Sequence, residues 1–380
     1  MSLTALVLSL PLLAPTPVAP APSGATAALG DHGKLPWFEG SYSDVLSAAK
    51  AEGKPVMLDF WTRWCGWCKR LDRDVFSNDA VVESMEGFLV WNADAESTRG
   101  GKVARRFKVA SFPTLIFLDP DGSPRDMIRG YLPPDEFEAE VRRLLRNEDT
   151  IGGYEARIEA NPDDLDARIR LVRKYELFND RIGLQRELRE IEARDPNAET
   201  VAGEYCRLER EKKGILMHWQ QTRSIDTSDL EAFLKQSKYP EVRHAGWTHV
   251  ATTRSNEAQQ ESGRSPAERI DELRMLSRNA YEAAWKDCPA QQRIPAGVDM
   301  LNRYCEPFDL NPQQKSFALR VARSLAELAP EDPPVLDALA RAEQASGAWK
   351  EARLTMQRCL DLEPDNPRWK RRMQELEQAQ

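Results

Sequence analysis

The sequence predicts an α/β layer domain followed by an all-α region that contains repeat-like helix pairs. Between about residues 34 and 147, short apolar runs suited to buried strands alternate with helix-like segments. Beyond this point the strand-like runs cease, and Arg- and Glu-rich amphipathic patterns continue to the end of the chain. A chain of 380 residues is long enough for two or three domains. We therefore expect one domain at 28–147 and a helical domain at 148–380.

The elements of the first domain follow from local patterns. A helix over 41–53 is expected to be capped by Ser41 or Ser43 and to end near Gly53. A turn is expected at 119–122, DPDG, because proline presets φ and glycine accepts positive φ. The remaining expected elements are strands at 55–61, 87–94, 113–119 and 126–130, and helices at 68–76, 100–109 and 133–147. Their alternation favours parallel strand pairing with a terminal hairpin at the sheet edge.

Residues 1–33 differ from the rest because they contain no Lys or Arg. An apolar run from Leu3 to Leu13 precedes a Pro- and Ala-rich segment that ends in Ala25-Thr26-Ala27. This pattern predicts a secretory signal peptide at 1–27, and hence a periplasmic or secreted protein. The missing positive n-region leaves a disordered, Pro-rich tail as the alternative. The apolar run is too short to span a bilayer, so no integral membrane span is expected.

The net charge of −8 argues against a general nucleic-acid binder, which normally has a basic field. The six cysteines are too few for a disulfide scaffold, and only Cys65 and Cys68 are clustered. These two follow a predicted strand and open a predicted helix, with both thiols on one helix face. Free N–H groups and the helix dipole stabilise a thiolate there. Cys65 would then be the attacking thiolate and Cys68 the resolving thiol.

Two other interpretations of the cysteine pair are a metal site and a structural staple. A structural zinc site needs four ligands, but there is no second Cys-X-X-Cys, and His244 and His249 are far away in sequence. A disulfide that closes so small a loop would stabilise the fold little. Disulfide exchange is therefore favoured, with no metal and no dissociable cofactor, because the cysteine pair itself carries two electrons.

The stretch VMLDFWTRWCGWCK at 56–69, followed by SFPTLIFLDPDG at 111–122, strongly resembles the thioredoxin superfamily, in particular its extracytoplasmic members with a WCGWCK motif. The resemblance covers about residues 37–147. It implies a thioredoxin-like fold in which Asp59 is a buried general base for Cys68. It also implies that Phe112-Pro113 contains a cis-proline whose backbone binds an extended substrate. A solvent-facing Asp59 and a trans-proline are the alternatives.

The sequence departs from the family at two places. Gly66-Trp67 separates the cysteines, in place of the Gly-Pro of reducing thioredoxins or the Gly-His of disulfide isomerases, so the direction of electron flow is open, with reduction favoured. The family's lysine beside the buried aspartate is replaced by Val90 or Trp91. Trp64 is expected to pack beside the active-site turn and Trp67 to extend an exposed substrate-binding patch, unless these rings fill the core.

The helical half contains two pairs of prolines thirty-four residues apart, Pro162 with Pro196 and Pro333 with Pro367. This is the period of a helix–turn–helix solenoid, and the second unit resembles a tetratricopeptide repeat in which Cys359 is a core residue. A plain helical bundle remains the alternative. A loop is expected at 255–266.

Three other cysteines lie in the helical half. Cys288 and Cys305 could form a structural disulfide in an oxidising compartment, whereas Cys206 is expected to be buried and inert.

Together these features predict a thiol–disulfide oxidoreductase whose partners are protein disulfides and a thiol electron donor or acceptor. The helical domain would bind a protein partner or substrate. The alternative is a helical-repeat adaptor or chaperone whose thioredoxin-like domain is a redox sensor.

Overall fold

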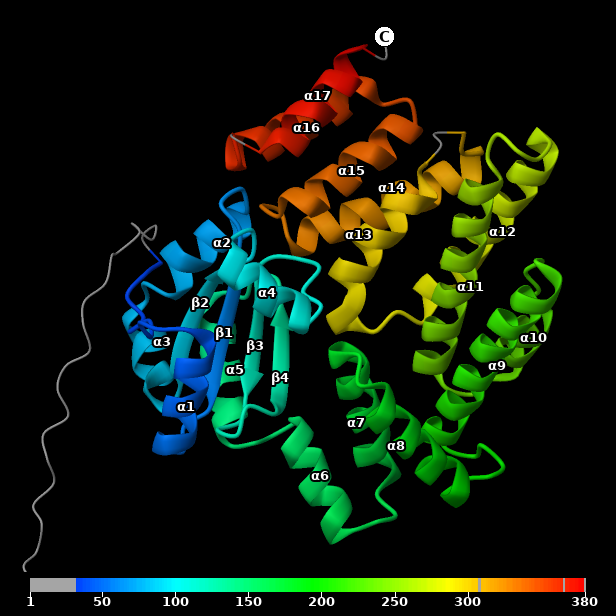
Figure 1. The fold of residues 1–380 in the computed structure, drawn as a ribbon. Helices are drawn as coiled ribbons and strands as arrows, with labels where there is room; N and C mark the ends of the chain where they lie inside the picture. The colour runs from blue at the N-terminus through cyan, green and yellow to red at the C-terminus, as the bar shows by residue number, and fades with distance from the viewer. Residues whose placement is uncertain (1–31, 307–308, 365, 379–380) are drawn as a thin grey trace, which may run out of the picture.

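The computed structural model of this chain describes residues 32–306, 309–364 and 366–378. The predicted signal peptide at 1–27 lies outside these residues. Within them, a four-stranded α/β unit is followed by twelve α-helices, α6 to α17 (Figure 1). The predicted order of an α/β domain and an all-α region is confirmed.

The sheet has the strand order β2-β1-β3-β4. Its strands are β1 (Val56–Trp61), β2 (Leu89–Asp94), β3 (Thr114–Leu118) and β4 (Pro124–Arg129). β1 and β2 pair in parallel, and β3 and β4 form the expected hairpin. The prediction of parallel pairing is wrong for β3, which runs antiparallel to β1.

The register explains this difference. Asp94 at the end of β2 pairs with Trp61, and Thr114 at the start of β3 pairs with Phe60. The connection through α4 (Thr98–Arg106) therefore stays at one end of the sheet and does not carry the chain back along it. A parallel β3 would need a crossover that returns to the opposite end.

Helices cover both faces of the sheet. On one face, Leu58 and Phe60 pack under α1 (Tyr42–Glu52) and α4. On the other face, Met57 packs with Leu71 and Val75 in a core covered by the remaining helices of this unit. These are α2 (Gly66–Arg70), the π-helix η1 (Leu71–Val75), α3 (Asp79–Ser84), the 3-10 turn η2 (Met85–Gly87) and α5 (Pro134–Leu145). Strand alternation thus assigns odd-numbered β1 residues to the α2–η1 face.

Local signals placed most of these elements correctly. The Ser41 side chain accepts a hydrogen bond from the Asp44 N–H in a capping box, and Gly53 ends α1 with φ 67°. Both features agree with the predicted boundaries. The short helix α3 was not predicted; Asn78 begins it by accepting bonds from the backbone N–H groups of Ala80 and Val81.

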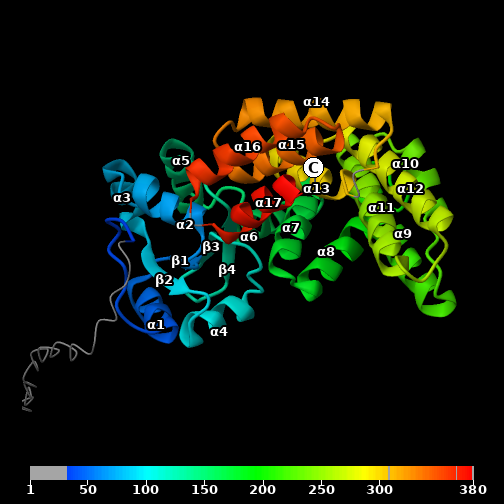
Figure 2. The ribbon, with the colours of Figure 1, turned by 90° about the horizontal axis from the view of Figure 1, so that it is seen from above.

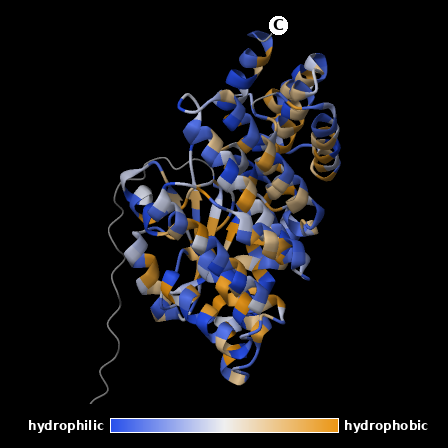
Figure 3. Cartoon of the chain, turned by 90° about the vertical axis from the view of Figure 1, so that its right-hand side faces the viewer, coloured by the Kyte–Doolittle hydropathy of each residue, from blue (hydrophilic) through white to orange (hydrophobic). Residues whose placement is uncertain are grey.

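The helices beyond α5 carry hydrophobic and hydrophilic residues along their length, as amphipathic helices do (Figure 3). They are α6 (Ile151–Ala160), α7 (Leu165–Phe178), α8 (Arg181–Arg194), α9 (Val201–Thr222), α10 (Ser228–Gln236), α11 (Pro240–Glu261), α12 (Ala267–Lys286), the 3-10 turn η3 (Ala290–Gln292), α13 (Arg293–Tyr304), α14 (Pro312–Leu328), α15 (Pro333–Ala345), α16 (Trp349–Leu362) and α17 (Pro367–Gln378). The two proline-spaced units are the helix pairs α7–α8 and α15–α16. Their tetratricopeptide character stays a prediction.

The loop expected at 255–266 is wrong for its first part, because α11 continues to Glu261. Ala258 is buried on this helix, and Glu257 pairs with Arg254 at 2.8 Å. Burial and the ion pair one turn apart outweigh the polar composition that suggested a loop.

The helical region touches the α/β unit at both of its ends (Figures 1 and 2). At the β4 edge, Lys174 of α7 pairs with the buried carboxylate of Asp126 at 2.7 Å. The chain then runs away from the sheet through α9–α12 and returns, so that α15–α17 lie beside α2. The final helices are thereby brought to the segment that carries the cysteine pair.

The four cysteines outside the pair are free and buried. The possible disulfide between Cys288 and Cys305 is therefore absent. α13 lies between the two residues, and its twelve residues span about 18 Å at the usual helical rise. Cys359 is fully buried in the core of α15–α17, as predicted, and Cys206 is buried as well.

Candidate active site

Cys65 and Cys68 form a disulfide with an S–S distance of 2.09 Å at the start of α2. The turn after β1 is closed by a hydrogen bond from the Cys65 N–H to the Thr62 carbonyl, at 3.1 Å. Cys65 then caps α2, and its Sγ accepts a hydrogen bond from the Cys68 N–H at 3.1 Å. Both cysteines are buried, with 5% of the surface of Cys65 and 4% of that of Cys68 exposed. The predicted placement of both thiols at the beginning of a helix is confirmed.

Asp59 is buried on β1, with 2% of its surface exposed, so the solvent-facing alternative is wrong. It shares the face of Met57, which is the face that α2 and η1 cover. Burial raises the pKa of Asp59 well above its usual value, and the carboxylate of Asp72 raises it further. Its Oδ1 atom has no hydrogen-bond partner among the described residues. A carboxyl group in this environment favours its protonated form.

Asp72 and His32 are part of this polar environment, and the sequence did not single them out as site residues. His32 Nδ1 lies 3.3 Å from Asp72 Oδ2, and the His32 ring lies 4.4 Å from the Trp61 ring. Asp72 follows Cys68 by four residues, so helical spacing could have indicated it. For His32 there was no such signal, because it comes from a segment before α1 that only the fold brings here.

The peptide bond between Phe112 and Pro113 is cis, as the family resemblance implied. The Phe112 ring packs edge-on against Trp64, with the ring centres 5.9 Å apart. Trp64 is 55% exposed and donates its Nε1–H to Glu96 at 2.8 Å. The proline loop and the cysteine turn are thus joined by a pair of aromatic rings.

Trp67 differs from its expected role as an exposed patch. It is half-buried, with its ring 5.2 Å from that of Tyr131 and the Arg70 guanidinium 5.3 Å from the ring centre. Trp64 is therefore the more exposed of the two tryptophans that flank the cysteines.

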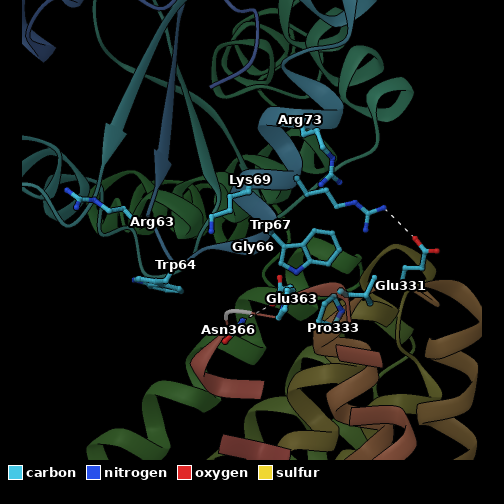
Figure 4. Close-up of a pocket in the computed structure, with 13 residues that line it drawn as sticks. Arg63, Trp64, Gly66, Trp67, Lys69, Arg73, Glu331, Pro333, Glu363 and Asn366 are labelled. Atoms are coloured by element: carbon cyan, nitrogen blue, oxygen red, sulfur yellow. Dashed lines mark hydrogen bonds and ion pairs between the residues drawn. The ribbon is translucent and has the colours of Figure 1, made fainter. Parts of the chain in front are cut away.

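A cleft of about 570 Å³ lies between the cysteine turn and the last helices (Figure 4). The α2 side contributes Arg63, Trp64, Gly66, Trp67, Lys69, Arg70 and Arg73, and the helical side contributes Glu331, Pro333, Leu362, Glu363, Pro364 and Asn366. Trp64, Gly66 and Trp67 are predicted site residues, whereas Phe112 and Pro113 are not among the lining residues. The sequence did not predict the helical wall, because its residues lie more than 260 positions after the cysteines.

Glu363 makes the closest approach across this cleft. A Cβ atom on Gly66 would overlap the Glu363 carboxylate, with only 2.6 Å to the carboxyl carbon. The other carboxylate oxygen, Oε2, accepts hydrogen bonds from Trp369 Nε1 at 2.5 Å and Asn366 Nδ2 at 2.7 Å. These two hydrogen bonds hold the Glu363 carboxylate against the backbone of the cysteine turn.

In the described part of the chain, no group of three or more His, Cys, Asp or Glu side chains is arranged to hold a metal ion. His244 instead makes a buried hydrogen bond between its Nδ1 and the Ala284 carbonyl, at 2.9 Å. None of the described helices combines the length and apolar character needed to cross a membrane.

Comparisons with known proteins identify a thioredoxin-like domain in this part of the chain. Residues 42–145 match the family model described as a thioredoxin-like domain. The chain is 33% identical over 102 residues to the thiol:disulfide interchange protein DsbD of Cronobacter sakazakii, an alignment that covers 26% of this chain and 18% of that protein. The chain thus spans less than a fifth of the length of this relative.

Solved structures that are similar to parts of the chain include a thioredoxin and a TPR domain. A thioredoxin from Thermus thermophilus is 28% identical and covers 29% of this chain and 87% of its own, with a TM-score of 0.26. The P58(IPK) TPR domain is 11% identical and covers 60% of this chain and 92% of its own, with a TM-score of 0.21.

Proposed function

We propose, from the thioredoxin-like domain at residues 42–145, that this protein is a thiol–disulfide oxidoreductase acting on protein substrates. The observation that carries the proposal is the Cys65–Cys68 pair at the start of α2, on the sheet face where Asp59 is buried. We place the domain boundary at 147/148, between α5 and α6, with one domain at 28–147 and the helical one at 148–380.

The first step uses the reduced enzyme. The Cys65 thiolate attacks one sulfur of a substrate disulfide, so that a bond forms between Cys65 and the substrate while the substrate S–S bond breaks. The second substrate sulfur leaves as a thiolate and takes up a proton. The position of Cys65 at a helix start supports this role, because the free N–H groups and the helix dipole favour its charged form.

The second step releases the substrate. Asp59 in its ionised form takes the proton of Cys68, and the Cys68 thiolate attacks the Cys65 sulfur. The Cys65–Cys68 disulfide forms, and the first substrate sulfur leaves as a thiolate that is protonated. Two electrons have then passed from the enzyme to the substrate. The raised pKa of Asp59 suits this role, because a base must hold the proton it removes.

A thiol donor must return two electrons to the enzyme in each cycle, and no dissociable cofactor takes part. Reduction of substrates is the favoured direction, with Gly66 and Trp67 between the cysteines and Trp64, Phe112 and Pro113 as substrate-binding residues. We further propose that the protein acts outside the cytoplasm, either in the periplasm or as a secreted protein. The N-terminal sequence, with its apolar run and small-residue triplet, supports this placement.

Reduction of insulin disulfides tests the activity directly. Wild type should reduce insulin in the presence of dithiothreitol, and Cys65→Ser should not accelerate the reaction at all. Cys68→Ser should accumulate a mixed disulfide with substrate that mass spectrometry identifies. Equal rates for wild type and Cys65→Ser would exclude the enzymatic function.

The contact between Glu363 and Gly66 favours a second candidate function, a helical adaptor or chaperone that senses redox state. The helical region touches the backbone of the redox-active turn, so a change at the cysteines could alter that contact. A sensor would change partner binding with its redox state but would not turn over. Turnover of insulin beyond one equivalent per enzyme distinguishes the enzyme from the sensor.

A further inference from the structure

The cleft between the cysteine turn and the last helices has two walls of different chemistry. Its α2 wall carries four cations, Arg63, Lys69, Arg70 and Arg73, whereas its helical wall carries the carboxylates of Glu331 and Glu363 (Figure 4). The cleft is thus net positive in a protein of net charge −8. Apolar surface from Trp64, Trp67, Pro333 and Leu362 lies between the charges.

Building on the proposed function, we infer that this cleft binds an extended segment of the substrate polypeptide that carries acidic side chains next to its disulfide. The helical domain would thereby help to select substrates for the cysteine pair. This substrate class goes beyond general disulfide exchange, because it depends on residues from both halves of the chain.

The size and position of the cleft favour a polypeptide segment. Its volume of about 570 Å³ falls in the range of about 300–1,000 Å³ that is typical of pockets for small ligands. A folded domain cannot enter such a space, whereas a few residues of extended chain can. Gly66 and Trp67 line the cleft, so a segment bound there lies directly at the cysteine turn.

The charges of the α2 wall favour acidic side chains. Lys69 is exposed and has no ion pair among the described residues. Arg63 has an exposed side chain, and its single carboxylate partner in the described part of the chain is Asp94, at 3.5 Å. Arg70 and Arg73 share Asp74, at 3.2 Å and 2.7 Å. This wall therefore has more cations than carboxylates to pair with them.

The carboxylates of the helical wall would orient an acidic segment bound in the cleft. Glu363 is fixed by Trp369 and Asn366, and Glu331 lies 3.8 Å from Arg70 across the cleft. An acidic side chain would be repelled from this wall and attracted to the opposite one. Glu331 is 71% exposed, so it can be replaced without disturbing a core.

The test compares three synthetic peptides that share one intramolecular disulfide and differ only in having Glu, Gln or Lys beside each cysteine. The full-length protein should reduce the Glu peptide with the highest kcat/KM and the Lys peptide with the lowest, and the difference should shrink as salt is added. Because all three peptides meet the same thiols, their ratio does not depend on the reactivity of Cys65.

Two charge reversals on opposite walls should change this ratio in opposite directions. Lys69→Glu should lower the Glu-to-Lys peptide ratio by about two- to tenfold, the effect expected for one exposed charge interaction that is reversed. Glu331→Lys should raise it by a similar factor. The matched controls are Lys50→Glu on α1 and Glu159→Lys on α6, which change net charge equally at exposed sites away from the cleft. They should leave the ratio unchanged.

The inference is overturned if wild type reduces the three peptides equally or prefers the Lys peptide. It is also overturned if the controls shift the ratio as much as the cleft variants do, because overall charge would then be the cause. Either result leaves the proposed function intact, provided that wild type turns over peptides and Cys65→Ser does not. Failure of wild type to reduce any peptide or insulin would instead refute the proposed function.

Discussion

Glu363 lies against Gly66, so that the turn between α16 and α17 touches the backbone between Cys65 and Cys68. The contact requires a residue without a side chain at position 66, because a Cβ atom would overlap the carboxylate. It joins two segments that are almost 300 residues apart in the sequence. The thioredoxin-like domain and the last helices therefore line one cleft.

Gly66→Ala should loosen this contact. The Glu363 side chain cannot simply swing away without losing its hydrogen bonds to Trp369 and Asn366. We expect a loss of about 1–3 kcal/mol in the free energy of unfolding, the usual cost of overpacking. Urea denaturation measures it. Glu363→Ala should make the Gly66→Ala change nearly neutral in a double-mutant cycle, and additive effects would contradict the contact.

Asp59→Asn should stabilise the oxidised protein at neutral pH. The raised pKa means that folded Asp59 binds its proton more tightly than the unfolded chain does. Wild-type stability therefore falls as pH rises from the usual value of 3.8 up to the folded-state pKa. The variant lacks this loss, so its advantage should grow across that window and vanish at lower pH. Urea titrations over a pH series measure it, and a difference that does not vary with pH would contradict the prediction.

Asp72→Asn should lower the pKa of Asp59, because it removes the neighbouring carboxylate that raises it. The rate at which Cys68 resolves a mixed disulfide should then reach its half-maximum at lower pH. Single-turnover kinetics with a trapped peptide measure this profile. His32, which faces Asp72, should be replaced by Gln in a parallel variant, because loss of its 3.3 Å contact could also alter the profile.

The exposed pair Asp79 and Lys34 provides the charge-matched control for Asp72. Asp79→Asn removes the same charge from a surface position and should leave the pH profile unchanged. An unchanged profile in Asp72→Asn would show that this carboxylate does not act on Asp59.

The four cysteines outside the pair should resist alkylation in the native protein. Burial raises the pKa of Cys206 and of Cys305 to about 12, and it raises the pKa of Cys288 and Cys359 as well. After reduction, iodoacetamide should therefore label Cys65 first. Peptide mass spectrometry with and without urea measures this, and native labelling of Cys288 as fast as Cys65 would contradict it.

Most of the α/β unit could be predicted because its signals are local. Ser41 and Gly53 mark the ends of α1, and the apolar run at 55–61 marks β1. The direction of β3 could not be predicted in this way. The direction of β3 depends on which end of β1 the chain reaches after α4, and no short stretch of sequence records this.

The candidate site likewise contains residues that the sequence indicated and residues that only the fold brings to it. Cys65 and Cys68 lie three residues apart, so helix periodicity was enough to relate them, and the family resemblance of the neighbouring stretch implied Asp59. Asp72 is one helical turn beyond and was within reach of the same argument. His32, Glu331 and Glu363 come from distant segments, and their side chains carry no motif.

The sequence by itself determined that a cysteine pair lies at a strand–helix junction, because this arrangement is defined by neighbouring residues. Only the tertiary structure decided what surrounds that pair. The helical region leaves the sheet at β4 and returns beside α2, and this path is set by the packing of many helices together. Such long-range packing places Glu363 against Gly66 and gives the cleft beside the cysteine pair its second wall.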